Sequence, residues 1–132
     1  MLDSKTISVS VDHDWQDLYA AFWQPEAFPR WASGLSNASL EKAGEDWKAQ
    51  GPQGPIGIKF TAHNAFGVMD HWVDLGDGRV IYVPLRIIAN ATGADVQLTL
   101  FRQPDMTETQ FAADGDWVMR DLLGLKTLAE RA

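Results

Sequence analysis

The hydrophobic and polar positions of residues 6–31 are typical of one β-strand followed by two short helical segments. Residues 6–11 alternate polar and apolar side chains, a period of two that predicts a half-buried strand. Over residues 15–22 the apolar side chains recur at i, i+3, i+4 and i+7, which predicts a helix with one apolar face. Pro25 ends this helix because proline cannot donate an interior hydrogen bond, and residues 26–31 form a second short helical segment.

From about residue 37 the pattern changes to that of an antiparallel sheet. Short alternating segments are separated by turns rich in Gly, Asn and Asp, which predicts a meander with short connections. Pro84 removes one donor from a strand ladder and indicates an edge or a bulge at that point. The expected strands lie at residues 38–45, 46–51, 56–61, 68–75, 79–90 and 95–103.

The last quarter of the chain predicts a long amphipathic helix. Thr107 and Gln110 have the spacing of a capping box at its start. Apolar residues and one glycine, at positions 111, 115, 118, 122, 125 and 129, form a single stripe along about six turns. Such a helix must lie on an apolar surface, and the sheet is the only one large enough. We therefore expect an α+β fold in which a strongly curved sheet leaves a cavity against helix 107–131.

Composition narrows the possible functions by exclusion. A length of 132 residues suits one domain, spanning residues 1-132. The net charge of -7 argues against nucleic acid as a partner and against an anionic membrane surface. The chain has no cysteine, its histidines show no metal-ligand spacing, and no apolar run approaches the roughly 20 residues that span a bilayer. We expect no metal, no cofactor and no membrane insertion, and a cytoplasmic location because residues 1–6 lack a signal-peptide core.

Five segments together resemble a known superfamily. They are residues 22–31 (FWQPEAFPRW), 64–71 (NAFGVMDH), 82–90 (YVPLRIIAN), 98–104 (LTLFRQP) and 111–126. They are similar to segments of the START-like or Bet v 1-like superfamily, and most of all to small bacterial SRPBCC proteins of the polyketide cyclase/dehydrase type. The resemblance spans residues 4 to 131.

The resemblance implies the helix-grip fold. In that fold a curved antiparallel sheet of about seven strands wraps around a long C-terminal helix, and two short helices follow strand 1. The superfamily includes lipid carriers, plant hormone receptors and aromatic cyclases, so the fold by itself does not fix the function.

His71 is the first candidate for a chemical role. Met69, His71, Val73 and Leu75 share one face of their strand, and because three of them are apolar we expect this face to point inward. An imidazole in an apolar cavity is a candidate general acid or base, which Asp70 would assist. The alternative is a buried histidine paired with a backbone carbonyl or with Asp70.

Arg86 is the second candidate, and its position depends on which face of its strand is buried. The odd-numbered residues of 81–89 are apolar, whereas Tyr82, Arg86 and Asn90 share the opposite face. If that face lines the cavity, Arg86 would bind a carboxylate or enolate oxygen. Otherwise it is solvated on the convex side of the sheet or pairs with an acid such as Asp70. Both alternatives are open at this stage.

A further set of residues is expected to line the ligand cavity, with ordinary core packing as the alternative for its apolar members. Trp72 is out of phase with His71 and is expected to face outward. The expected ligand-binding residues are Trp31, Phe60, Asn64, Tyr82, Asn90, Phe101, Trp117, Val118 and Leu122.

Three functions are compatible with these features. The first is the binding of a small apolar or aromatic molecule, by a monomer or a homodimer. The second is a cyclase/dehydratase that acts on a polyketide-like carbonyl substrate without a cofactor, with His71, Asp70 and Arg86 as catalytic residues. The third is a co-chaperone-like interaction module. A pocket that joins His71 to Arg86 favours the enzyme, an apolar pocket favours the carrier, and a filled interior beneath an exposed apolar patch favours the interaction module.

Overall fold

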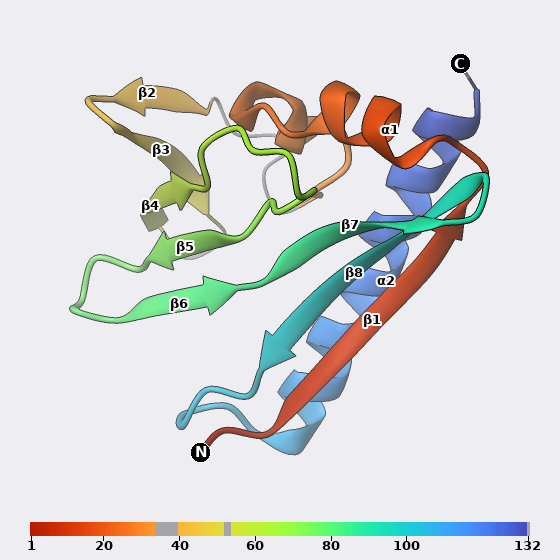
Figure 1. Cartoon of the computed structure of the whole chain (residues 1–132). Coiled ribbons are helices and arrows are strands. Elements are labelled where there is room, and N and C mark those ends of the chain that lie inside the picture. Colours follow the sequence, from red (N-terminus) through yellow and green to blue (C-terminus); the bar gives the residue numbers. More distant parts are fainter. Residues whose placement is uncertain (34–39, 52–53, 132) are drawn as a thin grey trace.

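The computed structural model describes residues 1–33, 40–51 and 54–131 (Figure 1). The expected strand at 38–45 is shorter in the structure, and its first two residues lie outside the described ones. The elements in chain order are β1 (Ser4–Val11), α1 (Trp15–Phe22), the 3-10 helix η1 (Pro25–Arg30), β2 (Glu41–Ala43), β3 (Asp46–Gly51), β4 (Gly54–Phe60), β5 (His71–Asp74), β6 (Val80–Val83), β7 (Leu85–Asn90), β8 (Gly93–Phe101) and α2 (Glu108–Glu130).

The strands form two antiparallel sheets that meet at Pro84. One sheet has the order β1-β8-β7 and the other β2-β3-β4-β5-β6. The prediction of one strand over 79–90 is wrong, because Pro84 lacks an N–H and the chain passes from the five-stranded sheet to the three-stranded sheet there. The Pro84 carbonyl instead accepts from the Thr99 N–H at 3.0 Å, which ties β6 to β8.

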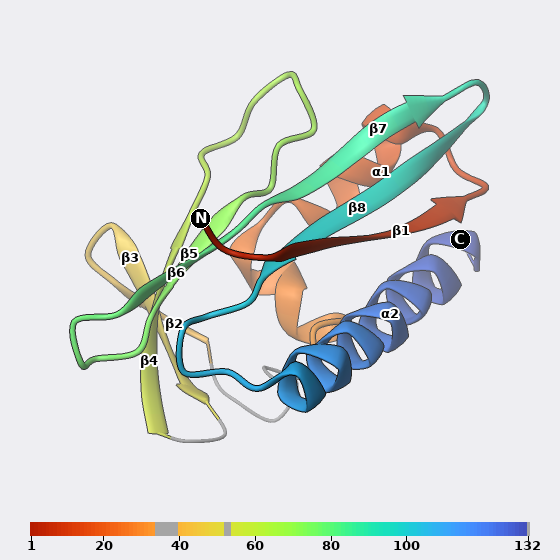
Figure 2. The same cartoon turned by 90° about the horizontal axis from the view of Figure 1, so that it is seen from below.

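Helix α2 lies along the three-stranded sheet, mainly over β1 (Figures 1 and 2). The capping box is confirmed: the Thr107 side chain accepts from the Gln110 N–H, and the Gln110 side chain accepts from the Thr107 N–H. Leu122 and Leu125 of the apolar stripe are fully buried. Gly115 is buried on the stripe and lies against the Lys5 side chain of β1. Among the described residues, no helix is both long enough and apolar enough to cross a bilayer.

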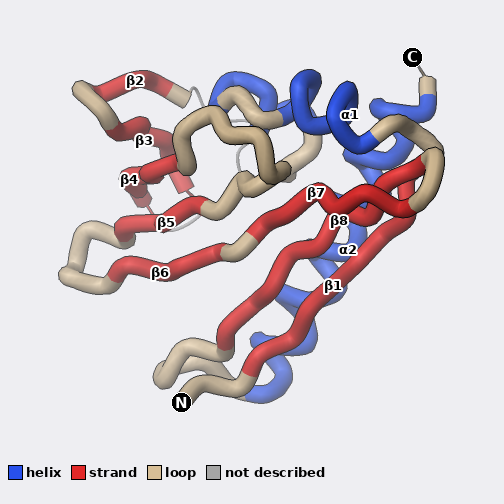
Figure 3. Tube along the Cα trace, in the orientation of Figure 1, coloured by secondary structure: helices blue, strands red, loops and turns tan. Residues whose placement is uncertain are grey.

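Helix α1 completes the solid part of the interior. Asp14 caps it by accepting from the N–H groups of Gln16 and Asp17. Leu18 and Phe22 are buried in one cluster with residues of β1, β7, β8 and α2. The tube in Figure 3 shows the three-stranded sheet with α1 and α2 close to it, and the five-stranded sheet extending away from them. The interior is therefore densely filled at the three-stranded sheet, and the fold is the expected α+β helix-grip arrangement.

Candidate functional site

A cavity of about 290 Å³ lies between the five-stranded sheet, β8, η1 and α2. Its wall is predominantly apolar, and His71 and Asp121 are its only ionisable residues in the described part of the chain. The lining residues are Phe28, Trp31, Ala32, Ile56, Ile58, Phe60, His71, Val73, Val83, Leu98, Leu100, Trp117, Val118 and Asp121. The structure thus has a hollow against α2, where the sequence predicted one.

Strand alternation and register explain why these side chains meet. Phe60, His71 and Val83 are opposite one another on β4, β5 and β6, so their side chains form one row across the inner face. Ile58 and Val73 form the next row. The prediction that the His71 face points inward agrees with this arrangement, since both His71 and Val73 line the cavity.

His71 is held in one orientation by two aromatic rings and a backbone carbonyl. Its ring centroid lies 5.4 Å from that of Phe28 and 5.9 Å from that of Phe60. Nδ1 is 3.2 Å from the Met69 carbonyl oxygen, and because a carbonyl only accepts, Nδ1 carries the proton of the neutral ring. Burial lowers the pKa of His71 and outweighs the opposing effects of Met69 and Asp70. The neutral ring therefore keeps Nε2 as an acceptor.

A hydrogen-bonded group from two segments lies at the rim of the cavity. The Ser33 hydroxyl donates to Oδ1 of Asp121 at 2.6 Å, and the Ser33 N–H donates to Oδ2 at 3.2 Å. Nε1 of Trp117 donates to the Ser33 hydroxyl. These contacts join α2 to the end of the segment that follows η1, and they fix the Asp121 carboxylate at the rim.

Trp31 lines the cavity and has a buried polar atom in its ring. Its side chain is 7% exposed and lines the cavity beside Phe28, whose ring centroid is 5.4 Å away. Its Nε1 is the one buried side-chain nitrogen or oxygen without a hydrogen-bond partner among the described residues. Buried indole N–H groups usually have an acceptor, so this donor calls for an explanation.

Asp70 and Arg86 face away from His71. The Asp70 carboxylate, 5% exposed, accepts from the Tyr82 hydroxyl at 2.6 Å, from the Leu85 N–H at 2.9 Å and from Nη2 of Arg86 at 2.9 Å. Burial raises the pKa of Asp70, but these three donors outweigh it and hold that pKa below its ordinary value. Of the two alternatives for Arg86, the structure shows the second: it pairs with Asp70 outside the cavity. His71, Asp70 and Arg86 therefore do not converge on one space.

Only some of the expected ligand-binding residues line the cavity. Trp31, Phe60, Trp117 and Val118 line the cavity. Leu122 is fully buried in the core beside it. Tyr82 and Phe101 stack on the outer face of the sheet, with ring centroids 6.2 Å apart. They lie there because each alternates with a cavity-lining neighbour on its own strand.

The two asparagines hold loops and lie away from the cavity. The Asn64 side chain donates to the carbonyls of Ala62 and Val68 and accepts from the N–H groups of Phe66 and Val68. Asn90 donates to Asp95 across the β7–β8 turn, at the far end of β8 from Leu100. A role for either residue in ligand binding stays a prediction, with no support from its position.

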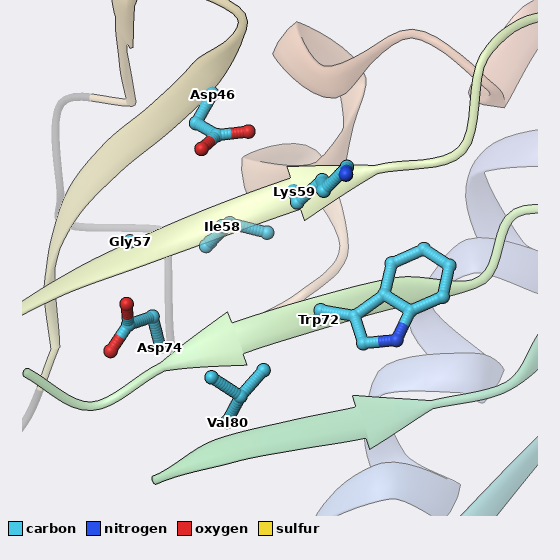
Figure 4. Close-up of a pocket in the computed structure, with 7 residues that line it drawn as sticks. All are labelled: Asp46, Gly57, Ile58, Lys59, Trp72, Asp74 and Val80. Atoms are coloured by element: carbon cyan, nitrogen blue, oxygen red, sulfur yellow. The ribbon is translucent and has the colours of Figure 1, made fainter. Parts of the chain in front are cut away.

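A second hollow, of about 330 Å³, lies on the outer face of the same sheet (Figure 4). Side chains from four neighbouring strands line it, among them Asp46, Lys59, Trp72 and Asp74. Trp72 points outward as predicted and stacks on Tyr82, with centroids 5.3 Å apart. This hollow contains three charged residues. It is a far more polar environment than the cavity behind it.

Several cavity residues were not named by sequence reasoning. Ile58, Leu98 and Leu100 lie in segments that were predicted as strands. The sequence did not show how these strands are placed relative to His71, so their place in the cavity wall was not predicted. Asp121 lies one helical turn from Trp117 on α2, a spacing that places both on one flank. No group of three or more His, Cys, Asp or Glu side chains that could hold a metal ion is found in residues 1–33, 40–51 and 54–131.

Comparison with known proteins gives likeness of structure without likeness of sequence. No family model and no curated protein matches the chain. Ara h 8.0201, a Bet v 1 homologue, superposes with a TM-score of 0.69 at 9% identity over 100% of both chains. The Aha1 dimer from Colwellia psychrerythraea gives 0.73 at 14% identity, over 98% of this chain and 97% of that one.

A third similar structure is DynU16, from the dynemicin biosynthetic locus. It gives a TM-score of 0.71 at 15% identity, over 97% of this chain but 47% of that one. Identities this low show a common fold and leave the activity open. The chain has the fold of the START-like or Bet v 1-like superfamily, and the resemblance seen in the sequence is confirmed at that level.

Proposed function

We propose that this protein binds a small, largely apolar or aromatic molecule in the cavity between α2 and the five-stranded sheet. The observation that carries the proposal is the cavity itself, an apolar space of about 290 Å³ with few polar groups. Ligand sites are typically concave and apolar, with a small number of placed polar atoms. A volume at the low end of the usual range favours a compact ligand over a long lipid chain.

The test is to fill the cavity without touching its polar groups. Val73 lines the cavity, whereas Val80 is 58% exposed on the outer side of the same sheet. Val73→Phe is expected to weaken naphthalene binding about tenfold or more, because the larger ring occupies the space. Val80→Phe is the matched control and is expected to leave binding unchanged. Affinities are measured by titration calorimetry, with urea unfolding to show that both variants fold.

Two outcomes would contradict the proposal. One is wild-type protein that binds neither naphthalene nor any other compact aromatic probe. The other is a folded Val73→Phe variant whose affinity equals that of the wild type.

Acid–base chemistry of the cyclase/dehydratase kind is the second candidate, and His71 is the observation that favours it. Its Nε2 accepts no hydrogen bond from the described chain and its lowered pKa keeps it neutral, as a general base requires. The other groups assigned to that reaction are engaged elsewhere, since Asp70 and Arg86 bind each other outside the cavity. Binding therefore has the stronger support. Turnover of a β-ketone substrate that His71→Phe abolishes would establish the enzyme instead.

A further inference from the structure

This inference rests on the proposed binding function. The polar atoms of the cavity wall indicate which chemical class of small molecule the cavity binds. Within the described chain the wall contains no lysine or arginine, and its one carboxylate, on Asp121, is already bound by Ser33. A carboxylate or phosphate on the ligand would lose its hydration and find no cation in return. The chain's net charge of -7 adds to this exclusion. The ligand is therefore not an anion.

His71 offers a single acceptor to such a ligand. Nδ1 is committed to the Met69 carbonyl, and the flanking rings of Phe28 and Phe60 restrict how far the imidazole can turn. No described group hydrogen-bonds Nε2, which is the polar atom that this cavity-lining ring has left to offer. A ligand that fills the space with hydrocarbon alone would leave this acceptor unpaired, at a cost in binding free energy.

Trp31 lines the same part of the wall with its ring. Its indole and the His71 imidazole both lie against Phe28, at centroid distances of 5.4 Å each. The Trp31 N–H is buried and has no acceptor in the described chain. A hydroxyl group is the simplest uncharged group that can donate to Nε2 of His71.

We propose that the cavity selects a compact aromatic molecule with a hydroxyl group and no negative charge, a phenol-like ligand whose O–H donates to Nε2 of His71. The aromatic part lies among Phe28, Phe60 and the aliphatic side chains of the sheet. The hydroxyl lies at the wall that His71 and Trp31 share.

The experiment compares four probes with the same double ring at neutral pH. Naphthalene has no polar group, naphthol adds an O–H, methoxynaphthalene keeps the oxygen without its hydrogen, and naphthoate is an anion. Naphthol is expected to bind about five- to tenfold more tightly than naphthalene, the increment of one hydrogen bond. Methoxynaphthalene is expected to gain nothing over naphthalene, and naphthoate to bind more weakly than both.

A pair of variants then assigns the preference to one residue. His71→Phe removes the acceptor and is expected to abolish the preference for naphthol while naphthalene still binds. His63→Phe is the matched control, because His63 is exposed and packs on Tyr19 and Trp23 away from the cavity. It is expected to retain the full preference.

The outcomes separate this inference from the proposed function. Equal affinity for naphthalene, naphthol and methoxynaphthalene, or a preference that survives in folded His71→Phe, would overturn the hydroxyl assignment and leave apolar binding intact. Tight binding of naphthoate would overturn the exclusion of anions. If His71→Phe does not fold, the comparison of naphthol with methoxynaphthalene on the wild-type protein still decides the point. Absence of binding by every probe would instead reject the proposed function.

Discussion

Two polar residues that are neighbours in the chain have opposite environments on the two faces of the five-stranded sheet. Asp70 and His71 are adjacent in the chain, yet Asp70 receives donors from Tyr82, Leu85 and Arg86 outside the cavity, whereas His71 lines the cavity. The Asp70 carboxylate is fully occupied. The His71 ring keeps one nitrogen without a hydrogen-bond partner in the described part of the chain. The comparison teaches that saturation of hydrogen bonds distinguishes a structural polar group from one that is available to a ligand.

The hydrogen-bond network around Asp70 lies at the junction of the two sheets. Leu85 begins β7 immediately after Pro84, where the chain leaves one sheet for the other. By binding the Leu85 N–H and two side chains, Asp70 fixes this crossing point. The Asp70 network therefore ties the start of β5 to β6 and to the start of β7, where the two sheets meet.

The largest effect is expected from removal of Asp70. Asp70→Ala leaves the Leu85 N–H and the Tyr82 hydroxyl without their acceptor, so we expect a loss of about 2–3 kcal/mol in the free energy of unfolding. Arg86 is half exposed and can be rehydrated, which limits the loss. Urea denaturation measures it. His71→Phe serves as the comparison and is expected to change stability far less; equal losses in both variants would erase the distinction between the faces.

The second-largest effect is expected in the pH dependence of the free energy of unfolding, where His71 and Asp70 act in different pH ranges. Burial lowers the pKa of His71 below its ordinary value of 6.5, so the unfolded chain takes up this proton first as the pH falls. The stability that neutral His71 contributes is complete above pH 6.5 and is lost as the pH falls through the folded pKa. Asp70 behaves in the same sense in a more acidic window, below its ordinary 3.8, because its folded pKa is lowered.

Urea unfolding at a series of pH values tests this separation. His71→Phe is expected to flatten the stability profile just below pH 6.5 and to leave the acid part unchanged. A profile that keeps its full slope below pH 6.5 in this variant would show that His71 is not the group responsible.

The smallest expected effect concerns the rim. Asp121→Asn removes the negative charge while retaining an oxygen that can accept from Ser33. Binding of naphthoate is expected to improve about threefold, a modest change because the rim is partly solvated. Naphthalene affinity should stay constant in the same calorimetric titration. Improvement for both probes would point to a looser rim instead of a lost repulsion.

Much of the fold was readable from local sequence. The alternation around Ile7 and the cap at Thr107 predicted β1 and the start of α2, because period and capping are properties of a few consecutive residues. The break at Pro84 was foreseen only as an edge or bulge. That it divides one apparent strand between two sheets depends on the pairing of β7 with β8, a contact between segments distant in the chain.

The candidate site was predicted less completely, for a related reason. Alternation and residue type placed His71 on an inward face, but for Arg86, opposite in phase to Leu85, they did not say whether its face would line the cavity. Phe101 and Tyr82 were expected in the cavity as aromatic residues, and the structure stacks them on its outer side. Residue type indicated what could bind a ligand, and side-chain direction decided which residues reach it.

The sequence by itself determined the elements, their order and the two faces of each strand, since these follow from periodicity and from the chemistry of caps, prolines and turns. Only the tertiary structure decided that the hydrogen bonds of Asp70 are satisfied by Tyr82, Leu85 and Arg86, while Nε2 of His71 at the cavity wall has no partner among the described residues. The physical reason is that hydrogen-bond saturation depends on partners brought together by folding from separate parts of the chain.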